Sequence, residues 1–178
     1  LEEADAPIER AHLLQELGRL ACRTGDYARS VELADTALGS VDMIDIEAGA
    51  EIIIEVARAK AEAFNTKGVA LARLGRSHEA FGNVERSIEV AEQNGLLTAA
   101  CRGYTNLSVL YTTTDPARAM ELCRRGLDIA RRIGDLGFQA RLLANLAVAS
   151  CTFTDRCGEE GIPAAEEAIE LDRALDQR

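Results

Sequence analysis

The sequence repeats a two-helix pattern four times, and this repeat constrains the fold more than any other feature. Each copy contains an anchor whose second residue is small, at Leu17-Gly18, Lys67-Gly68, Leu107-Ser108 and Leu146-Ala147. Apolar residues at helical spacing precede and follow every anchor. Helices of a hairpin approach closely only where facing side chains are small, while larger apolar residues fill the grooves one turn away. The pattern therefore predicts four stacked helix hairpins and an all-α fold.

Residues that end and cap helices separate the apolar stretches. Asp115 is a predicted N-cap before Pro116 at the first helical position, Gly134-Asp135 ends one helix and starts another, and Gly75-Arg76-Ser77 is expected to do the same. The expected helices cover residues 8–24, 27–40, 48–74, 77–94, 97–113, 116–133, 136–152 and 160–176. The first two anchors are separated by about ten extra residues, around 41–47, which form a loop or lengthen the next helix. We favour a long helix over 48–74, of roughly 40 Å.

Composition supports a helical protein and restricts its partners. Of the 178 residues only 4% are aromatic and none is Trp, which argues against a sandwich or barrel. The formal charge of −10 argues against nucleic acid or an anionic membrane as the main partner, and no stretch approaches the roughly 20 apolar residues of a membrane span. The five cysteines, Cys151 and Cys157 included, show no paired framework. They predict reduced thiols and a cytoplasmic location.

The repeat resembles the tetratricopeptide repeat over about residues 8–176, most clearly between Lys67 and Arg76 and again between Asn106 and Leu110. The resemblance implies a right-handed α-α superhelix, a solenoid, of four hairpins at about 8–46, 47–95, 96–134 and 135–178, in a single array over 1–178. The spacing of about 40 residues is similar to the C-terminal arrays of bacterial nucleotide cyclases and of transcriptional activators that carry an ATPase module. It implies a regulatory part of a bacterial signalling protein. Because the chain starts at Leu1 within helical sequence, we expect a piece of a longer protein.

Motifs for catalysis, cofactors or metals do not emerge. The sequence lacks the glycine-rich phosphate loop, the dinucleotide fingerprint and the Gly-x-Ser-x-Gly elbow. His78-Glu79 lacks the second His of a zinc peptidase motif, and Cys151 and Cys157 are too far apart for ordinary zinc spacing. The acidic residues Asp42, Asp45 and Glu47 are interpreted as a solvated loop. We therefore expect no enzyme activity, no cofactor and no metal.

A polar face on the first helix of each hairpin is the best candidate site. The positions six and two residues before the small anchor residue and one after it lie a helical turn apart, and in a superhelix they face the concave groove. The first of these positions holds His12, Glu62, Arg102 and Arg141 in the four hairpins. The second holds Glu16, Thr66, Asn106 and Asn145, and the third holds Arg19, Val69, Val109 and Val148. Asn amides can bond a peptide backbone and Arg can fork onto a carboxylate. The predicted groove residues are His12, Arg19, Asn65, Arg102, Asn106, Arg141 and Asn145.

The resemblance adds that some tetratricopeptide arrays hold a peptide's terminal carboxylate with groove Asn and basic residues, carried over here to Asn65, Asn106, Arg102 and Arg141. The alternative is that the Asn side chains bond neighbouring helices and the Arg side chains pair with acidic residues. We interpret the chain as a non-catalytic scaffold that binds a peptide, acidic or C-terminal, or another protein domain. The second interpretation is a module that senses a small molecule or a signalling peptide, for which a dry apolar pocket is expected.

Two further surfaces are singled out by their charge and apolarity. Arg118, Arg125 and Arg132 recur every seven residues, with Arg124 and Arg131 beside them, which indicates a solvated basic face or a site for an acidic partner. The last helix is acidic and also carries an apolar face that no following helix covers. Because solenoids need polar caps, this face predicts fragment status or end-to-end association.

Overall fold

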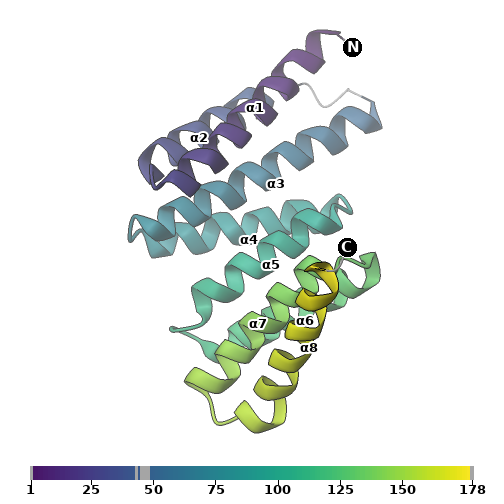
Figure 1. Ribbon diagram of the computed structural model, residues 1–178. Helices are drawn as coiled ribbons and strands as arrows, with labels where there is room; N and C mark the ends of the chain where they lie inside the picture. The colour runs from purple at the N-terminus through teal and green to yellow at the C-terminus, as the bar shows by residue number, and fades with distance from the viewer. Residues whose placement is uncertain (1, 43, 45–48, 177–178) are drawn as a thin grey trace. The chain divides into compact units, whose positions relative to one another are not determined.

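The computed structural model describes residues 2–42, 44 and 49–176, without the side chains of residues 2–5, and these residues form only helices and short turns. The helices are α1 (Glu2–Thr24), α2 (Tyr27–Asp42), α3 (Ala50–Arg73), α4 (Ser77–Gln93), α5 (Leu97–Tyr111), α6 (Pro116–Ile133), α7 (Leu136–Phe153), the π-helical turn η1 (Cys157–Gly161) and α8 (Ile162–Asp176) (Figure 1). The predicted all-α fold class is confirmed. None of the described helices combines the length and apolarity that crossing a membrane requires.

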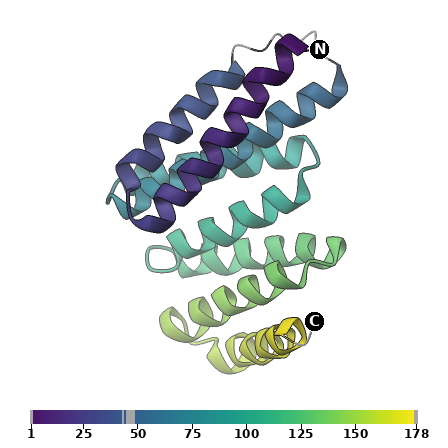
Figure 2. The same ribbon diagram turned by 45° about the horizontal axis from the view of Figure 1, so that its top comes forward.

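The helices divide into two compact units, residues 1–99 and 100–178. In the first unit α1 packs on α2 and α3, α2 packs on α3, and α3 packs on α4. Figure 2 shows α1, α2 and α3 lying alongside one another. In the second unit α6 packs on α7, and α7 packs on η1 and α8. The prediction of a single array over 1–178 stays a proposal.

Small residues at the anchors permit the close packing within each hairpin, as the repeat predicts. A Cβ added at Gly68 of α3 would come 2.5 Å from Val84 Cγ2 and 3.0 Å from the Ala80 carbonyl oxygen on α4. Buried hydroxyls add bonds between helices in this first unit. Ser30 Oγ donates to the Gly18 carbonyl (2.8 Å), and Ser87 Oγ donates to the Ala61 carbonyl (2.7 Å).

In the hairpin of α5 and α6, the small residue at the close contact is Gly126, which lies on the second helix. A Cβ at Gly126 of α6 would lie 2.8 Å from Tyr104 Cβ and 2.9 Å from Leu142 Cδ2, so side chains of α5 and α7 both approach α6 closely at this residue. Tyr104, Leu122 and Leu142 are fully buried there. Burial also raises the pKa of the Cys101 and Cys123 thiols to about 11, because a thiolate is poorly solvated in this core.

Most of the predicted helix boundaries agree with the structure to within two residues. The Asp115 side chain accepts from the backbone N–H of Arg118 (3.0 Å) ahead of Pro116, and the Asp135 side chain accepts from Phe138 N–H (2.9 Å). Gly134 ends α6 with φ 69°, in the left-handed region where a side chain would be strained. The cap expected at Gly75-Arg76-Ser77 is wrong in detail, because the N-cap residue of α4 is Arg76 and its side chain makes no cap bond.

One boundary differs more from the prediction. Helix α1 begins at Glu2 rather than at residue 8 and contains Pro7. A proline in the second turn removes only one hydrogen bond near the helix end, which this helix tolerates. The extra residues between the first two anchors lengthen α3, which covers 24 residues, while Asp45 and Glu47 lie outside the described residues. Asp42 is not merely solvated, because its Oδ1 pairs with Lys60 Nζ at 2.7 Å.

The prediction that Cys151 and Cys157 are reduced thiols is wrong. The two sulfurs form a disulfide that joins the last turn of α7 to the first residue of η1. The six-residue separation looked too irregular for a framework, but the turn after Phe153 reverses the chain and brings the Cα atoms to 4.1 Å. Cys22, Cys101 and Cys123 are free thiols. The cysteine content therefore no longer argues for a reducing compartment.

Candidate functional site

Four of the predicted groove residues lie together on α5 and α7 in the second unit. Asn145 Nδ2 on α7 donates to the Thr105 carbonyl and to Ser108 Oγ on α5, each at 3.1 Å. The bonds join the two helices at positions about one repeat apart in sequence, and the ribbon shows that α5 and α7 run in the same direction (Figure 1). Arg102 and Asn106 on α5 are thereby placed in the same register as Arg141 and Asn145 on α7. We call this surface, with Val109 and Val148, the α5–α7 face.

Asn145 has a structural role in this face. Both hydrogen bonds use the amide nitrogen of its side chain, so its donor capacity is spent in holding α7 against α5. For this residue the alternative interpretation, that groove Asn side chains bond neighbouring helices, describes the geometry. Arg102 and Asn106 are half-buried, whereas Arg141 is exposed and its guanidinium lies 5.8 Å from the centre of the Phe138 ring.

The charge of the α5–α7 face is entirely positive. Arg102 is the only charged residue of α5, and Arg141 is the only charged residue of α7. The protein as a whole carries a formal charge of −10, so two neighbouring helices without a carboxylate stand out. A face of this kind attracts an anionic group and repels a cationic one.

Exposed valines lie beside these arginines. Val109 is 55% exposed and Val148 is 51% exposed, and they occupy the same repeat position on α5 and α7. Both valines lie at the predicted groove positions but are not among the predicted site residues. Their exposure gives the face an apolar strip next to the positive charges, which suits an amphipathic segment of another chain.

The first unit places its three predicted groove residues differently. His12 Nε2 on α1 lies 3.4 Å from Glu55 Oε2 on α3, and Arg19 pairs with Glu16 at 3.0 Å within α1. Asn65 is buried, next to Thr66, whose hydroxyl accepts from Gln15 Nε2 at 3.5 Å. Here the polar residues contact one another, and α1 and α3 carry both acidic and basic side chains. The α5–α7 face is therefore the stronger candidate for a binding surface.

The basic residues of α6 find acidic partners within the same unit. Arg124 forks onto Glu160 of η1 with contacts of 2.7 and 2.6 Å, and Arg131 pairs with Glu167 of α8 at 2.7 Å. The guanidinium of Arg124 lowers the pKa of Glu160 below its ordinary value. Arg118 pairs with Glu121 of α6 itself, Arg125 lies over the Tyr104 ring and Arg132 is exposed. Three arginines of α6 therefore have acidic partners within the unit, and two of these pairs join α6 to η1 and α8.

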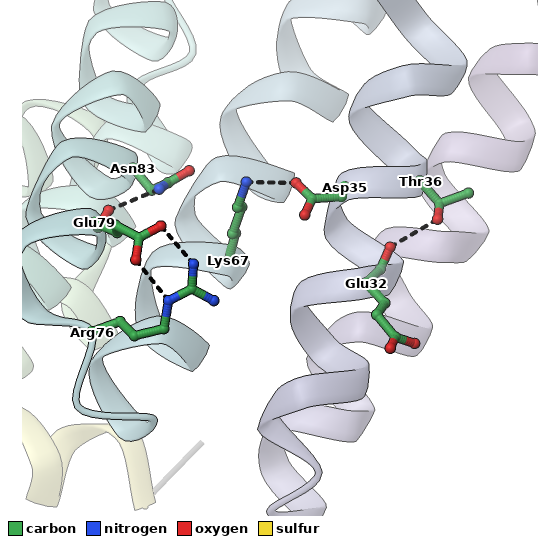
Figure 3. A network of polar contacts seen from close by, with 7 residues as sticks. All are labelled: Glu32, Asp35, Thr36, Lys67, Arg76, Glu79 and Asn83. Carbon is green, nitrogen blue, oxygen red and sulfur yellow. Dashed lines mark hydrogen bonds and ion pairs between the residues drawn. The ribbon is translucent and has the colours of Figure 1, made fainter.

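A second polar network lies on the first unit and spans three helices (Figure 3). Lys67 of α3 pairs with Asp35 of α2, and Arg76 at the start of α4 forks onto Glu79 with contacts of 2.7 and 2.6 Å. That fork lowers the pKa of Glu79. Thr36 and Asn83 bond carbonyls of their own helices. The network pairs opposite charges internally, and we assign it to helix packing.

A surface hollow of about 300 Å³ also lies in the first unit. It is lined by Arg58 and Glu62 of α3 and by the chain from Gly95 to Ala99. Charged side chains and backbone atoms dominate this lining. The hollow therefore lacks the dry apolar character expected of a small-molecule sensor.

Comparison with solved structures shows what this fold is similar to. The chain superposes on aspartyl phosphate phosphatase F from Bacillus subtilis with a TM-score of 0.79 and 9% sequence identity, over 95% of this chain and 42% of that one. It also superposes on the TPR-like repeats of a putative kinesin light chain from Podospora anserina, with a TM-score of 0.51 and 14% identity, over 97% of this chain and 99% of that one. The chain thus spans less than half the length of the phosphatase.

No protein-family model matches the sequence, and no curated protein matches it either. The likeness to solved structures is therefore one of fold alone. It supports a TPR-like fold, as the family resemblance implies, and the stacked helix hairpins that the anchors predict.

Proposed function

We propose that the chain is a non-catalytic scaffold of a signalling protein, and that its α5–α7 face binds an acidic or C-terminal peptide segment. The observation that carries the proposal is the charge of this face. Two neighbouring helices carry Arg102 and Arg141 and no carboxylate, beside the exposed Val109 and Val148. An extended segment with carboxylates and apolar side chains in alternation matches both properties.

The proposal extends to the setting of the protein. A protein or peptide partner is supported by the TPR-like fold, and the formal charge of −10 argues against nucleic acid or an anionic membrane. The partner is a free segment or another domain of the parent protein. We propose a bacterial cytoplasmic location, which rests on the family resemblance and not on the cysteines, because two of them form a disulfide.

Fluorescence anisotropy with a designed peptide tests the charge selectivity. The probe is a short labelled peptide of alternating Glu and Leu with a free C-terminal carboxylate, compared with its C-terminal amide and with a Lys/Leu version. We expect the Glu/Leu peptide to bind more tightly than the Lys/Leu peptide, and added salt to weaken it. Equal binding of the Lys/Leu peptide would remove the proposal.

The arginine variants test where the peptide binds. Arg141→Ala should weaken binding by about three- to tenfold, since an exposed charged contact contributes on the order of 1 kcal/mol. Arg102→Ala with Arg141→Ala should weaken it further. Arg132→Ala is the matched control, because Arg132 is an exposed arginine of the same unit on α6. An equal loss in Arg132→Ala would indicate general electrostatic attraction instead of a site.

The small-molecule sensor is the weaker alternative. It calls for an enclosed apolar pocket, whereas the hollow beside Arg58 and Glu62 is polar and the more apolar hollows beside Leu17 and Leu20 of α1 are open at the surface. The same titrations distinguish the two functions, because a sensor of small molecules would show no preference among peptides of different charge.

A further inference from the structure

Helix α1 exposes a row of leucines at positions that are buried in a later repeat. Leu13, Leu17 and Leu20 are 67%, 52% and 56% exposed. Counted from the small anchors, the same positions on α7 hold Leu142, Leu146 and Ala149, and all three are buried. Leu142 lies close to Gly126, so on α7 this row is the surface that packs on the preceding second helix, α6. On α1 the same surface has no such cover among the described residues.

Helix α8 also exposes apolar side chains at positions that are buried in the other repeats. Ile169 occupies the repeat position of Leu38, Ile88 and Leu127, which are buried, yet it is 50% exposed. Leu38 shows what this position normally contacts, since it belongs to a buried cluster with Ala59 and Ala63 of α3, the first helix of the next hairpin. Ile162, two turns earlier on α8, is also 51% exposed. The exposed row of α8 is thus the surface that a following first helix would cover.

The internal interface predicts how such helices meet. Lys60 pairs with Asp42 and Lys67 pairs with Asp35, so α3 and α2 run in opposite directions. In the same arrangement, the start of α8 faces the end of α1. Glu166 is exposed near the start of α8, and Arg23 is exposed at the end of α1 beside the leucines, whereas Arg19 pairs with Glu16 within α1. The ends that would meet thus place an exposed carboxylate and an exposed guanidinium beside the two apolar rows.

We propose that the leucine row of α1, formed by Leu13, Leu17 and Leu20, receives α8 of a second copy of this chain. Ile169 and Ile162 of one copy pack on the leucines of the next, and the contact repeats the internal packing of a second helix on the following first helix. The contact joins two different surfaces, so it leaves one free end on each terminal copy. Association through it is independent of the α5–α7 face.

Sedimentation velocity on the 178-residue chain tests this contact. We expect the average mass to rise with concentration above the 19.2 kDa of one copy. Leu17→Glu and Ile169→Glu should each lower the association constant by more than about tenfold, because each places a carboxylate in an apolar contact. Both side chains are exposed within one copy, so the variants should fold, and Leu20→Glu replaces Leu17→Glu if that variant does not.

Mixing the variants decides between this contact and any other. Each variant keeps one intact end, so an equimolar mixture of Leu17→Glu and Ile169→Glu should form a dimer of about twice the monomer mass and nothing larger. Leu74→Glu, at an exposed leucine after α3, should leave association unchanged. The proposal is overturned if the unmodified chain stays monomeric, if either variant associates alone as the unmodified chain does, or if the mixture stays monomeric.

Discussion

Gly68 is a residue at which α3 approaches α4 closely. A Cβ there would overlap Val84 and press on the backbone of α4, so Gly68→Ala should force the hairpin apart and lower the free energy of unfolding by about 1–3 kcal/mol. Gly82 on α4 is the matched control, since it is exposed and a Cβ there meets nothing within 4 Å.

Gly82→Ala should instead stabilise the chain by about 0.5–1 kcal/mol, because alanine loses less backbone entropy in a helix. Urea unfolding followed by circular dichroism measures both changes. If the two variants shift stability in the same direction by the same amount, the close approach at the anchor does not matter for folding.

Residue-level prediction from the sequence succeeds where the chemistry is local. Asp115 and Asp135 are recognisable as caps because a cap needs only the next few residues. The role of Asn145 depends on which carbonyl of α5 lies opposite, and the Cys151–Cys157 bond depends on how the chain turns after Phe153. Neither relation is contained in the spacing of the residues along the chain.

Among the elements, η1 is held to α6 by the two hydrogen bonds between the Arg124 guanidinium and the Glu160 carboxylate. Glu160→Gln removes the charge and should lower the free energy of unfolding by about 1 kcal/mol at neutral pH, since the carboxylate is largely buried and Arg124 is partly exposed. The pKa of Glu160 in the folded protein lies below its unfolded value. Its contribution is therefore complete above the unfolded pKa and is lost as the pH falls through the folded pKa.

Denaturant unfolding at several pH values checks this dependence. The difference between the unmodified chain and Glu160→Gln should be constant near neutral pH and shrink in acid. Glu159→Gln is the control, because Glu159 is the exposed neighbour on the same turn. A difference that persists unchanged in acid would mean that packing of Glu160, and not its charge, stabilises η1.

The disulfide is the covalent constraint on the same turn. Mass spectrometry of the denatured chain after alkylation should count three labelled cysteines without reductant and five with it. Reduction should also lower the thermal midpoint, because closing a short loop stabilises the fold by roughly 2 kcal/mol. The double variant Cys151→Ser with Cys157→Ser should melt at a temperature that reductant does not change. Five labels without reductant would contradict the disulfide.

Element-level prediction was accurate for helix positions and weak for contacts between helices. The anchors and caps placed eight helices because a 3.6-residue period is readable over any long amphipathic stretch. The basic stripe of α6 was visible in the sequence, but its partners Glu160 and Glu167 lie 36 residues away. Identifying them requires the register between α6 and α8, which side-chain packing decides.

For the whole molecule, the repeat in the sequence predicted a TPR-like fold that comparison with solved structures confirms. The predicted site divides between the two units, and only the α5–α7 face combines uniform charge with exposed apolar side chains. In the first unit, His12 contacts Glu55 on α3, which the sequence could not assign to it, whereas Arg19 pairs with Glu16 on its own helix, a spacing that the sequence shows. Whether the first helix of a hairpin offers a binding surface thus depends on the side chains that lie next to it in the folded chain.

The central claim is that the α5–α7 face binds an acidic segment. Amide chemical shifts of the ¹⁵N-labelled chain, recorded during titration with the Glu/Leu peptide, test it residue by residue. We predict saturable shifts concentrated around Arg102, Asn106 and Val109 on α5 and around Arg141 and Val148 on α7. Shifts that gather instead on α6, on α8 or on the leucine row of α1, or shifts absent altogether, would contradict it.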